Sequence, residues 1–414
     1  MADAPRAPRS WRARIFALTW LSYFAFYFAR SNFSIVKKNI EDLGLGSKAD
    51  FANVDTFYLV SYAVGQFVWG FTADIVSPRK LLGFGMLATA ALAFIAGLGG
   101  TLGIIVIAFG LNGLTQSSGW PGNGRVMASW FSARERGVWL GFWGTCYQLG
   151  PIAAGLLAGY LLVNYGWQAT FIGPAIWVTV VALALILLLR DRPSDVGFAD
   201  PDRVTPADKA AARAARRAAW KAMLRKKTVW LLGANYFCTK FIRYALWFWL
   251  PYYFGTQLQY ADDTAAYLSR SFDVGGVIGV ITGGLLADRV FSRRRISVAA
   301  CSMLLLALGL YVYSEVGATS MVANFVIMAF VGMFLFSSDS LVSGAAAQDA
   351  GGPEAAAAAC GFINGVGSIG AVAQSLLLVP IVDAWGWDGL FQVFIGMALV
   401  AVVVLIPLWR ERPE

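Results

Sequence analysis

The chain has 414 residues, of which 58% are hydrophobic and only 14% are charged. Its mean hydropathy of +0.61 excludes an ordinary soluble globular protein and indicates a helical protein that crosses a membrane many times. Its net charge of +9 could indicate a nucleic-acid partner, but most basic residues lie on one side of the predicted spans, which argues against one. Histidine is absent, which removes the usual proton relay, the usual metal ligand and histidine-based nucleophilic catalysis, so we do not expect an enzyme.

Apolar runs of about 20 residues predict membrane-spanning helices, and the chain contains twelve such runs. The first six spans are expected at 15–37, 52–75, 80–100, 102–130, 137–164 and 167–190. The other six are expected at 228–257, 264–288, 296–315, 320–348, 355–384 and 387–409. The predicted fold class is therefore an all-α membrane protein with two six-helix bundles, 1–190 and 228–414.

The segment 191–227 joins the two predicted bundles and is rich in Ala, Arg and Lys. This composition predicts a cationic amphipathic helix on the inner membrane face, which serves as a linker or, alternatively, as a regulatory or partner-binding element. Most Lys and Arg residues lie on the side of this linker, which predicts that both termini are cytoplasmic. The first residues carry no signal-peptide pattern, so we expect the first span itself to insert the protein. The absence of a transit peptide and the short loops favour a bacterial inner membrane.

An arginine, Arg30, lies deep in the first predicted span, within the stretch YFAFYFARSNF. A guanidinium at that depth is costly, so such residues usually mark a pathway or a binding site. The pattern returns in YFCTKFIRYAL, where Tyr236 and Arg243 take the positions of Tyr23 and Arg30. Two matched arginines predict a two-sided anion site, because planar guanidiniums grip a tetrahedral anion well. Alternatively, each arginine pairs with a carboxylate or a helix end.

Tyr27 and Lys240 each precede one of these arginines by three residues, so each shares a helix face with its arginine. Both are candidate ligands, although Lys240 could instead pair with an acid inside the membrane. Tyr23 and Tyr236 lie one turn further toward the cytoplasm, and each is either a ligand or a packing residue.

The two halves of the chain repeat each other, since GFTADIVSPRK in the first half is echoed by GLLADRVFSRRR in the second. Parallel six-span repeats joined by a basic loop resemble the major facilitator superfamily, in which the substrate binds near the bilayer midplane. The two repeated stretches resemble the signature loop of that superfamily. This resemblance implies that Asp74, Arg79, Asp288 and Arg293 are gating residues and not ligands.

Residues 119–143, GWPGNGRVMASWFSARERGVWLGFW, resemble the organophosphate:phosphate antiporter family. The later stretches KFIRYALWFWLPYYF, FDVGGVIGVITGGLLAD and NGVGSIGA are similar to the sugar-phosphate exchanger branch of that family. The resemblance covers essentially all twelve spans. It implies that Arg30 and Arg243 bind the phosphoryl group of the substrate.

The chain departs from the glycerol-phosphate members of that family at two positions. Those members place a lysine in the second span and a histidine in the fifth, where this chain has Gln66 and Tyr147. We expect these two side chains, together with Gln148, to be hydrogen-bond donors to substrate hydroxyls.

A carboxylate, Asp339, lies in the tenth predicted span. It could pair with Lys240 or Arg243 when no substrate is bound, accept a substrate ammonium group, or carry a proton. Arg270 and Asp273 lie one turn apart in the eighth span and are expected to neutralise each other.

The sequence therefore predicts a secondary active transporter that exchanges an organic phosphate, such as a sugar phosphate, for inorganic phosphate by alternating access. We expect no cofactor, no metal and no nucleic-acid partner, and a monomer in the lipid bilayer. One alternative is a proton- or sodium-coupled carrier of a phosphonate or carboxylate that uses Asp339. Another is a membrane sensor of sugar phosphates that contacts a partner through 191–227.

Overall fold

The computed structural model describes residues 5, 7–72, 76–132, 135, 139–140, 142–200, 220–291 and 294–409. These residues are almost entirely helical, which confirms the predicted all-α fold class. The chain divides into two compact units. The first consists of Met1–Val204 with Tyr260–Tyr267, and the second of Thr205–Gln259 with Leu268–Glu414. The predicted bundle boundaries at 190 and 228 stay a prediction.

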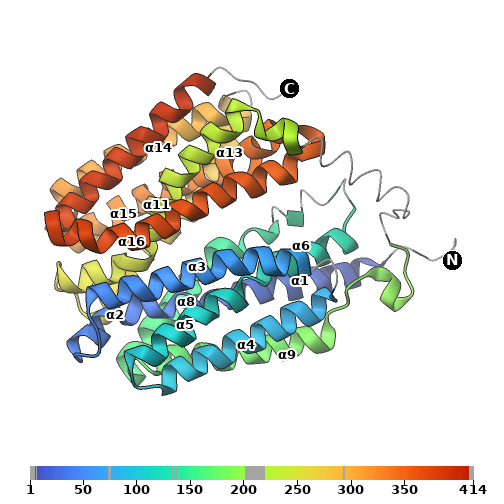
Figure 1. Cartoon of the computed structure of the whole chain (residues 1–414), viewed down its shortest axis with the longest axis horizontal. Helices are drawn as coiled ribbons and strands as arrows, with labels where there is room; N and C mark the ends of the chain where they lie inside the picture. Colours follow the sequence, from blue (N-terminus) through green and yellow to red (C-terminus); the bar gives the residue numbers. More distant parts are fainter. Residues whose placement is uncertain are drawn as a thin grey trace. The chain divides into compact units, whose positions relative to one another are not determined.

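The helices of the first unit follow the first six predicted spans, with two of the spans divided. They are α1 (Arg9–Phe26), α2 (Asn32–Asp42), α3 (Lys48–Thr72), α4 (Pro78–Leu98), α5 (Leu102–Gln116), α6 (Gly119–Trp130), α8 (Cys146–Tyr165) and α9 (Ala169–Leu188). Helix α3 packs on α5, and α4 packs on both α5 and α9, as the blue, cyan and green ribbons of Figure 1 show.

The first and fourth predicted spans are interrupted near their middles. A 3₁₀ turn, Tyr27–Ala29, separates α1 from α2, and the side-chain amide of Asn112 donates to the Ala29 carbonyl at 2.8 Å. Between α5 and α6, the hydroxyls of Ser117 and Ser118 donate to carbonyls of α5. Breaks at membrane depth require such partners, because no water is there to replace the lost backbone hydrogen bonds.

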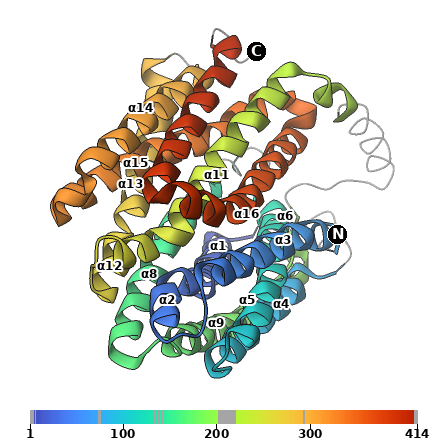
Figure 2. The same ribbon diagram turned by 60° about the vertical axis from the view of Figure 1, so that its left-hand side comes forward.

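The helices of the second unit cover the remaining predicted spans. They are α11 (Lys227–Thr256), α13 (Ser271–Leu285), α14 (Arg295–Val316), α15 (Met321–Ser340) and α16 (Ala347–Leu405). The short helix α12 (Asp262–Leu268) precedes α13 in the chain but groups with the first unit as far as Tyr267. Two π-helical turns extend α13 and α15, at Leu286–Val290 and Leu341–Ala346. Helix α11 packs along α16, which Figure 2 shows beside it.

Helix α16 contains the last two predicted spans. A continuous helix of its 59 residues would be roughly 90 Å long, about three times the thickness of a bilayer core. Gly386 has a φ of +69° inside it, a left-handed conformation that interrupts a right-handed helix. This glycine lies between the predicted spans 355–384 and 387–409.

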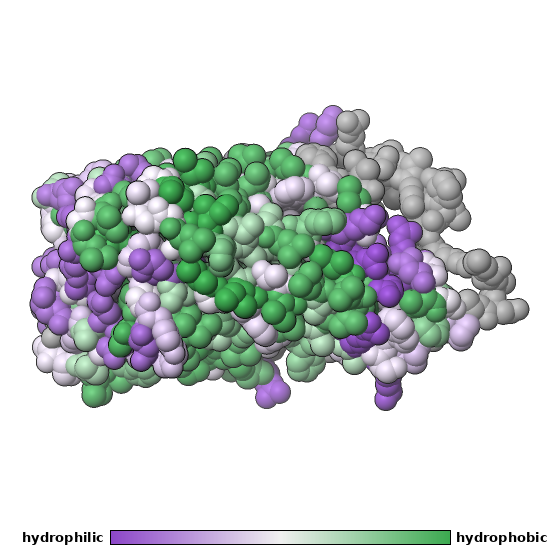
Figure 3. Space-filling model, turned by 90° about the horizontal axis from the view of Figure 1, so that it is seen from below, coloured by the Kyte–Doolittle hydropathy of each residue, from purple (hydrophilic) through white to green (hydrophobic). Residues whose placement is uncertain are grey.

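Large apolar side chains are exposed along the helices. On α4 and α9, Phe84, Leu98 and Leu187 are 64%, 64% and 69% exposed. On the face drawn in Figure 3, hydrophobic residues cover a broad middle area and hydrophilic residues gather toward the ends. By length and composition, seven helical segments among the described residues can cross a membrane, including one of 51 residues, Ala358–Leu408. An apolar exterior of this kind is suited to lipid.

In the second unit, α13 and α15 touch backbone to backbone. A Cβ atom added to Gly275 would lie 1.8 Å from the Ala329 carbonyl oxygen, and one added to Gly279 would lie 1.9 Å from that of Met333. Small residues allow this approach, which supplies packing where lipid provides no hydrophobic driving force between helices.

We predict that Gly279→Ala destabilises the second unit, because the methyl group would collide with the backbone of α15. Overpacking of this kind typically costs about 1–3 kcal/mol, and a lower apparent melting temperature in detergent would report it. The matched control is Gly284→Ala on the same helix, since nothing lies within 4 Å of its added Cβ. Equal melting temperatures for the two variants would contradict the close packing.

Candidate functional site

Arg30 lies at the end of the 3₁₀ turn between α1 and α2 and is only 5% exposed. Its Nε donates to Gln116 Oε1 at 2.9 Å. The rings of Tyr27 and Tyr62 each lie 4.9 Å from the guanidinium carbon. Its Nη2 atom is buried and has no hydrogen-bond partner among the described residues. A buried charged donor without an acceptor is costly, so this nitrogen is suited to receive one from a ligand.

Gln116 is held in place by neutral groups. Its Oε1 also accepts from the Tyr58 hydroxyl at 3.2 Å, and its Nε2 donates to Asn112 Oδ1 at 3.2 Å. Asn112 in turn donates to the Ala29 carbonyl in the helix break. Within the described residues, no carboxylate lies at ion-pair distance from Arg30. The positive charge of Arg30 is therefore solvated by protein dipoles and is not neutralised.

Three of the predicted tyrosines of the first unit gather beside Arg30. The Tyr23 ring lies 5.9 Å from that of Tyr27 and 4.7 Å from that of Tyr147, measured between centroids. The ring centroid of Trp143 lies 5.2 Å from that of Tyr23, so Trp143 packs against the same group of rings. The structure thus brings Tyr23, Tyr27 and Tyr147 together with Arg30.

Two other predicted ligands of the first unit are not joined to this group. Gln66 is half-buried on α3, and Gln148 lies near the start of α8 with its Oε1 atom buried. Among the described residues, no hydrogen bond joins either amide to Arg30, and Gln148 Oε1 has no donor. Gln148 Oε1 is one of several buried polar atoms of this unit without a hydrogen-bond partner among the described residues, and Ser31 Oγ and Asn32 Nδ2, which follow Arg30, are two others.

In the second unit, Arg243 of α11 pairs with Asp339 of α15. The Nη1 atom of Arg243 lies 3.2 Å from Oδ1 and 3.1 Å from Oδ2 of Asp339. The guanidinium also lies 4.6 Å from the centre of the Phe336 ring. The sequence left Lys240 and Arg243 as alternative partners of Asp339, and in the structure the partner is Arg243.

Lys240 contacts α16 instead of Asp339. Its ammonium donates to Asn364 Oδ1 at 2.6 Å and to the Ser368 hydroxyl at 3.2 Å. It also lies 5.1 Å from the centre of the Tyr236 ring, so these two predicted residues are adjacent. Lys240 is 7% exposed and its partners are neutral. Lys240 and Arg243 are thus two neighbouring cations on α11, of which Lys240 has neutral partners and Arg243 has the carboxylate of Asp339.

Two further ion pairs are sealed from solvent. Arg270 and Asp273 lie 3.0 Å apart with side chains 3% and 2% exposed, which confirms that they neutralise each other. Lys37 of α2 and Asp55 of α3 lie 2.6 Å apart and are 0% and 1% exposed, a pair that the sequence did not reveal. The Lys37 pair joins α2 to α3, and the Arg270 pair lies at the first turn of α13. The Arg243 and Asp339 side chains are more accessible, at 20% and 12% exposed.

The predicted gating residues are only partly described. Asp74, Arg293 and the side chain of Asp288 lie outside the described residues. The backbone N–H of Arg79 donates to Asp191 Oδ1 at 2.7 Å, and Asp191 also accepts from the Ser77 hydroxyl. This contact ties the start of α4 to the end of the sixth span, and a gating role for Arg79 stays a prediction. Most of the predicted amphipathic helix, 201–219, also lies outside the described residues.

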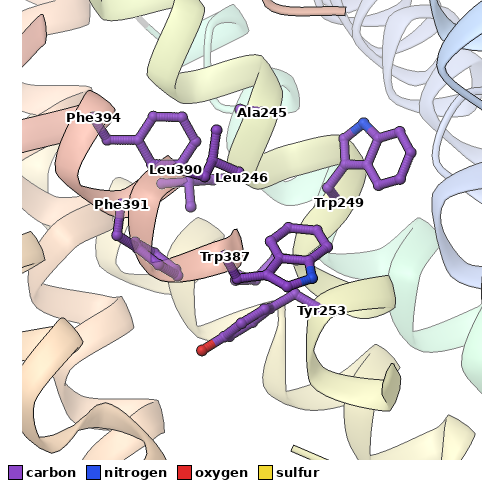
Figure 4. A pocket seen from close by; sticks show the side chains of 9 residues that line it. Ala245, Leu246, Trp249, Tyr253, Trp387, Leu390, Phe391 and Phe394 are labelled. Carbon is purple, nitrogen blue, oxygen red and sulfur yellow. The ribbon is translucent and has the colours of Figure 1, made fainter. Parts of the chain in front are cut away.

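An apolar pocket in the second unit is distinct from these polar clusters. Trp249, Tyr253, Trp387 and Phe391 surround it, and their rings crowd together in Figure 4. The Tyr253 and Trp387 centroids are 5.1 Å apart. No charged side chain lines this pocket, so it does not suit an anion. Among the described residues, no cluster of three or more His, Cys, Asp or Glu could hold a metal.

Sequence reasoning missed four polar residues that hold the candidate ligands. Asn112 and Gln116 support Arg30, and Asn364 and Ser368 support Lys240. Each pair is spaced four residues apart inside an apolar span, which places both members on one helix face. This four-residue spacing of polar side chains within an apolar span was the signal in the sequence by which they could have been found.

The family model of the Major Facilitator Superfamily matches residues 19–375 of this chain. A "Probable hexose phosphate transport protein" of Chlamydia trachomatis is 28% identical, over 98% of this chain and 92% of that protein. The "Membrane sensor protein UhpC" of Escherichia coli is also 28% identical, over 96% of this chain and 92% of that protein. "Sugar phosphate exchanger 3" of Gallus gallus is 30% identical, over 95% of this chain and 91% of that protein.

The fold is also similar to that of solved structures. A bacterial homologue of the human lysosomal transporter Spinster, in an inward-facing and unoccupied conformation, superimposes with a TM-score of 0.80. The match covers 99% of this chain and 100% of that one at 15% sequence identity. The likeness supports the fold and carries no information about the ligand.

We predict that Lys37→Met strongly destabilises the first unit, because it removes the ammonium group from a sealed carboxylate. Breaking a buried pair from one side typically costs about 3–5 kcal/mol, whereas replacing both partners by apolar residues is often neutral. The double variant Lys37→Met/Asp55→Leu should therefore recover most of the lost thermal stability. A single variant as stable as the parent protein would show that the pair is not a structural fastener.

Proposed function

Because this chain belongs to the Major Facilitator Superfamily, we propose that it exchanges an organic phosphate for inorganic phosphate across a membrane. Members of this superfamily are transporters and not enzymes, and the chain is a multi-pass membrane protein. Two of the relatives named above carry hexose phosphate or sugar phosphate in their names, and a further relative is a "Putative glycerol-3-phosphate transporter 2" of Arabidopsis thaliana. The phosphoryl group is the feature that these ligands share.

The observation that carries the proposal is the environment of Arg30. A guanidinium that is 5% exposed, hydrogen-bonded to a neutral amide and left with an unused donor nitrogen has an uncompensated positive charge. A phosphoryl dianion supplies both the negative charge and several acceptor oxygens in one compact group. Arginine keeps its proton in any protein environment, so the charge of the site persists in every transport state.

The second unit supplies the other basic residues of the proposal. Arg243 and Lys240 are three residues apart on α11 and are both accessible only to a small degree. We assign Arg30, Arg243 and Lys240 to the phosphoryl group. Tyr27, Tyr147, Gln66 and Gln148 would bind the hydroxyls of the organic part. Tyr23 packs beside Tyr27 and Tyr147 in the first unit, and Tyr236 packs beside Lys240 in the second.

Binding must favour one conformation of the carrier over another, because a ligand shifts an equilibrium only through its different affinity for the two states. We propose that the phosphoryl group stabilises the transition between inward- and outward-open states. Asp74, Arg79, Asp288 and Arg293 would act in that transition as gating residues. In this proposal the protein is a monomer in a bacterial inner membrane with both termini in the cytoplasm.

The proposal is tested by counterflow in proteoliposomes preloaded with inorganic phosphate. Labelled phosphate is followed while sugar phosphates, glycerol phosphate and phosphoglycerates are supplied outside. Exchange of phosphate, with competition from at least one organic phosphate, supports the antiporter and names its substrate class. Absence of phosphate movement in any direction would contradict it.

A coupled carrier of another anion is the second candidate, and the partly accessible Asp339 favours it as a proton-carrying group. This candidate predicts that transport collapses when the proton or sodium gradient is dissipated. Exchange that depends only on phosphate on the opposite side would exclude it. A sensor is the third candidate, favoured by similarity to the E. coli sensor, and it predicts ligand binding without turnover.

We predict that Arg30→Lys and Arg243→Lys each lower phosphate exchange by about ten- to a hundredfold. A lysine keeps the charge but loses the planar fork, and a hydrogen bond to a charged group is worth about 1.5–3 kcal/mol. Counterflow rates at equal protein density measure the effect. Arg14→Lys is the matched control, because this arginine donates to the Leu188 carbonyl at an exposed position. Normal exchange by both site variants would contradict the assignment.

A further inference from the structure

The carboxylate of Asp339 is hydrogen-bonded to the guanidinium of Arg243, which the proposed transport function assigns to the phosphoryl group of the substrate. We propose that this carboxylate is an internal competitor for Arg243, which the transported anion must displace. On this basis Asp339 sets the affinity of the carrier for phosphate and the ease with which bound phosphate leaves. This role rests on the proposed function, and it differs from the roles of a proton carrier or an ammonium acceptor.

The geometry of the pair is that of a weak ligand. Both carboxylate oxygens contact the same nitrogen of Arg243, at 3.2 and 3.1 Å. Charge-assisted hydrogen bonds between arginine and a carboxylate are typically about 2.7–2.9 Å long and use two parallel nitrogens. A phosphoryl group, with three terminal oxygens and up to two charges, can bind the fork better than this carboxylate does.

Accessibility separates this pair from the other intramembrane pairs. The side chains of Arg243 and Asp339 are 20% and 12% exposed, whereas those of Arg270 and Asp273 are 3% and 2% exposed. A small anion can therefore reach the first pair, while the second is sealed. The Lys37 pair, at 0% and 1%, is sealed as well.

The backbone around Asp339 departs from a regular α-helix. The π-helical turn Leu341–Ala346 begins two residues later, and the Ser343 hydroxyl donates to the Asp339 carbonyl at 2.7 Å. π-helical turns are rare and occur frequently at functional sites, where they change the direction of a side chain. The π-helical turn therefore makes α15 irregular next to Asp339, the residue that has to release Arg243.

The neighbouring cation does not substitute for Arg243 in this arrangement. The Lys240 ammonium is engaged by Asn364 and Ser368 of α16, at 2.6 and 3.2 Å. Displaced from Arg243, the Asp339 carboxylate would be hydrated through its exposed fraction and would repel an incoming anion. Both the competition and the repulsion lower the affinity for phosphate.

The test compares binding of inorganic phosphate to the purified full-length protein and to Asp339→Asn. We expect Asp339→Asn to bind phosphate about tenfold more tightly and to exchange it more slowly at saturation, because release is hindered. Asp339→Glu keeps the charge and should bind phosphate with an affinity close to that of the parent. Asp383→Asn, which removes a charge from an exposed position of the same unit, should change neither quantity.

Each outcome is decisive. Unchanged or weaker phosphate binding by folded Asp339→Asn overturns the competitor role and favours a proton carrier or an ammonium acceptor. If the parent protein exchanges phosphate but the variant does not bind it more tightly, only this inference fails. If neither protein binds phosphate, the proposed function fails with it. Asp339→Ser, which copies the neighbours Ser338 and Ser340, replaces the asparagine variant if that one does not fold.

Discussion

Burial of arginine inside apolar helices is the constraint around which both units are arranged. A guanidinium at membrane depth is tolerated only where other groups solvate or pair it. The interruption between α1 and α2 places Arg30 where Gln116 can accept its hydrogen bond, and Asn112 closes the backbone that the interruption opens. In the second unit, Asp339 meets the same need for Arg243. In both units, a polar side chain from a neighbouring helix thus supplies the partner that an apolar helix lacks for its arginine.

The two units meet this need differently, although the sequence places their arginines in the same register. Among the described residues, Arg30 has neutral partners and no carboxylate at ion-pair distance, while Arg243 has the carboxylate of Asp339. Tyr27 precedes the first arginine by three residues and Lys240 precedes the second, so the second unit adds one cation and one anion. The repeated arginine register therefore has unlike surroundings in the two units, and the proposed transport function gives the two arginines different roles: Arg30 attracts an anion, and Arg243 holds it in competition with Asp339.

Much of the fold was predictable, because an apolar run of about 20 residues has few alternatives to a membrane helix. Arg30 and Arg243 were recognisable for the same reason, as charges inside such runs. The interruption at Tyr27–Ala29 was not, because no proline or glycine marks it and the group that stabilises it, Asn112, belongs to another helix. The partner of Asp339 stayed open among several groups, since α15 is brought to α11 only by packing.

The most direct measurement of the central claim is an experimental structure of the protein with inorganic phosphate bound. The account predicts phosphate oxygens at about 3 Å from guanidinium nitrogens of both Arg30 and Arg243, with the Asp339 carboxylate no longer on Arg243. Phosphate bound elsewhere, with Arg30 still held only by Gln116 and Arg243 still paired with Asp339, would contradict it.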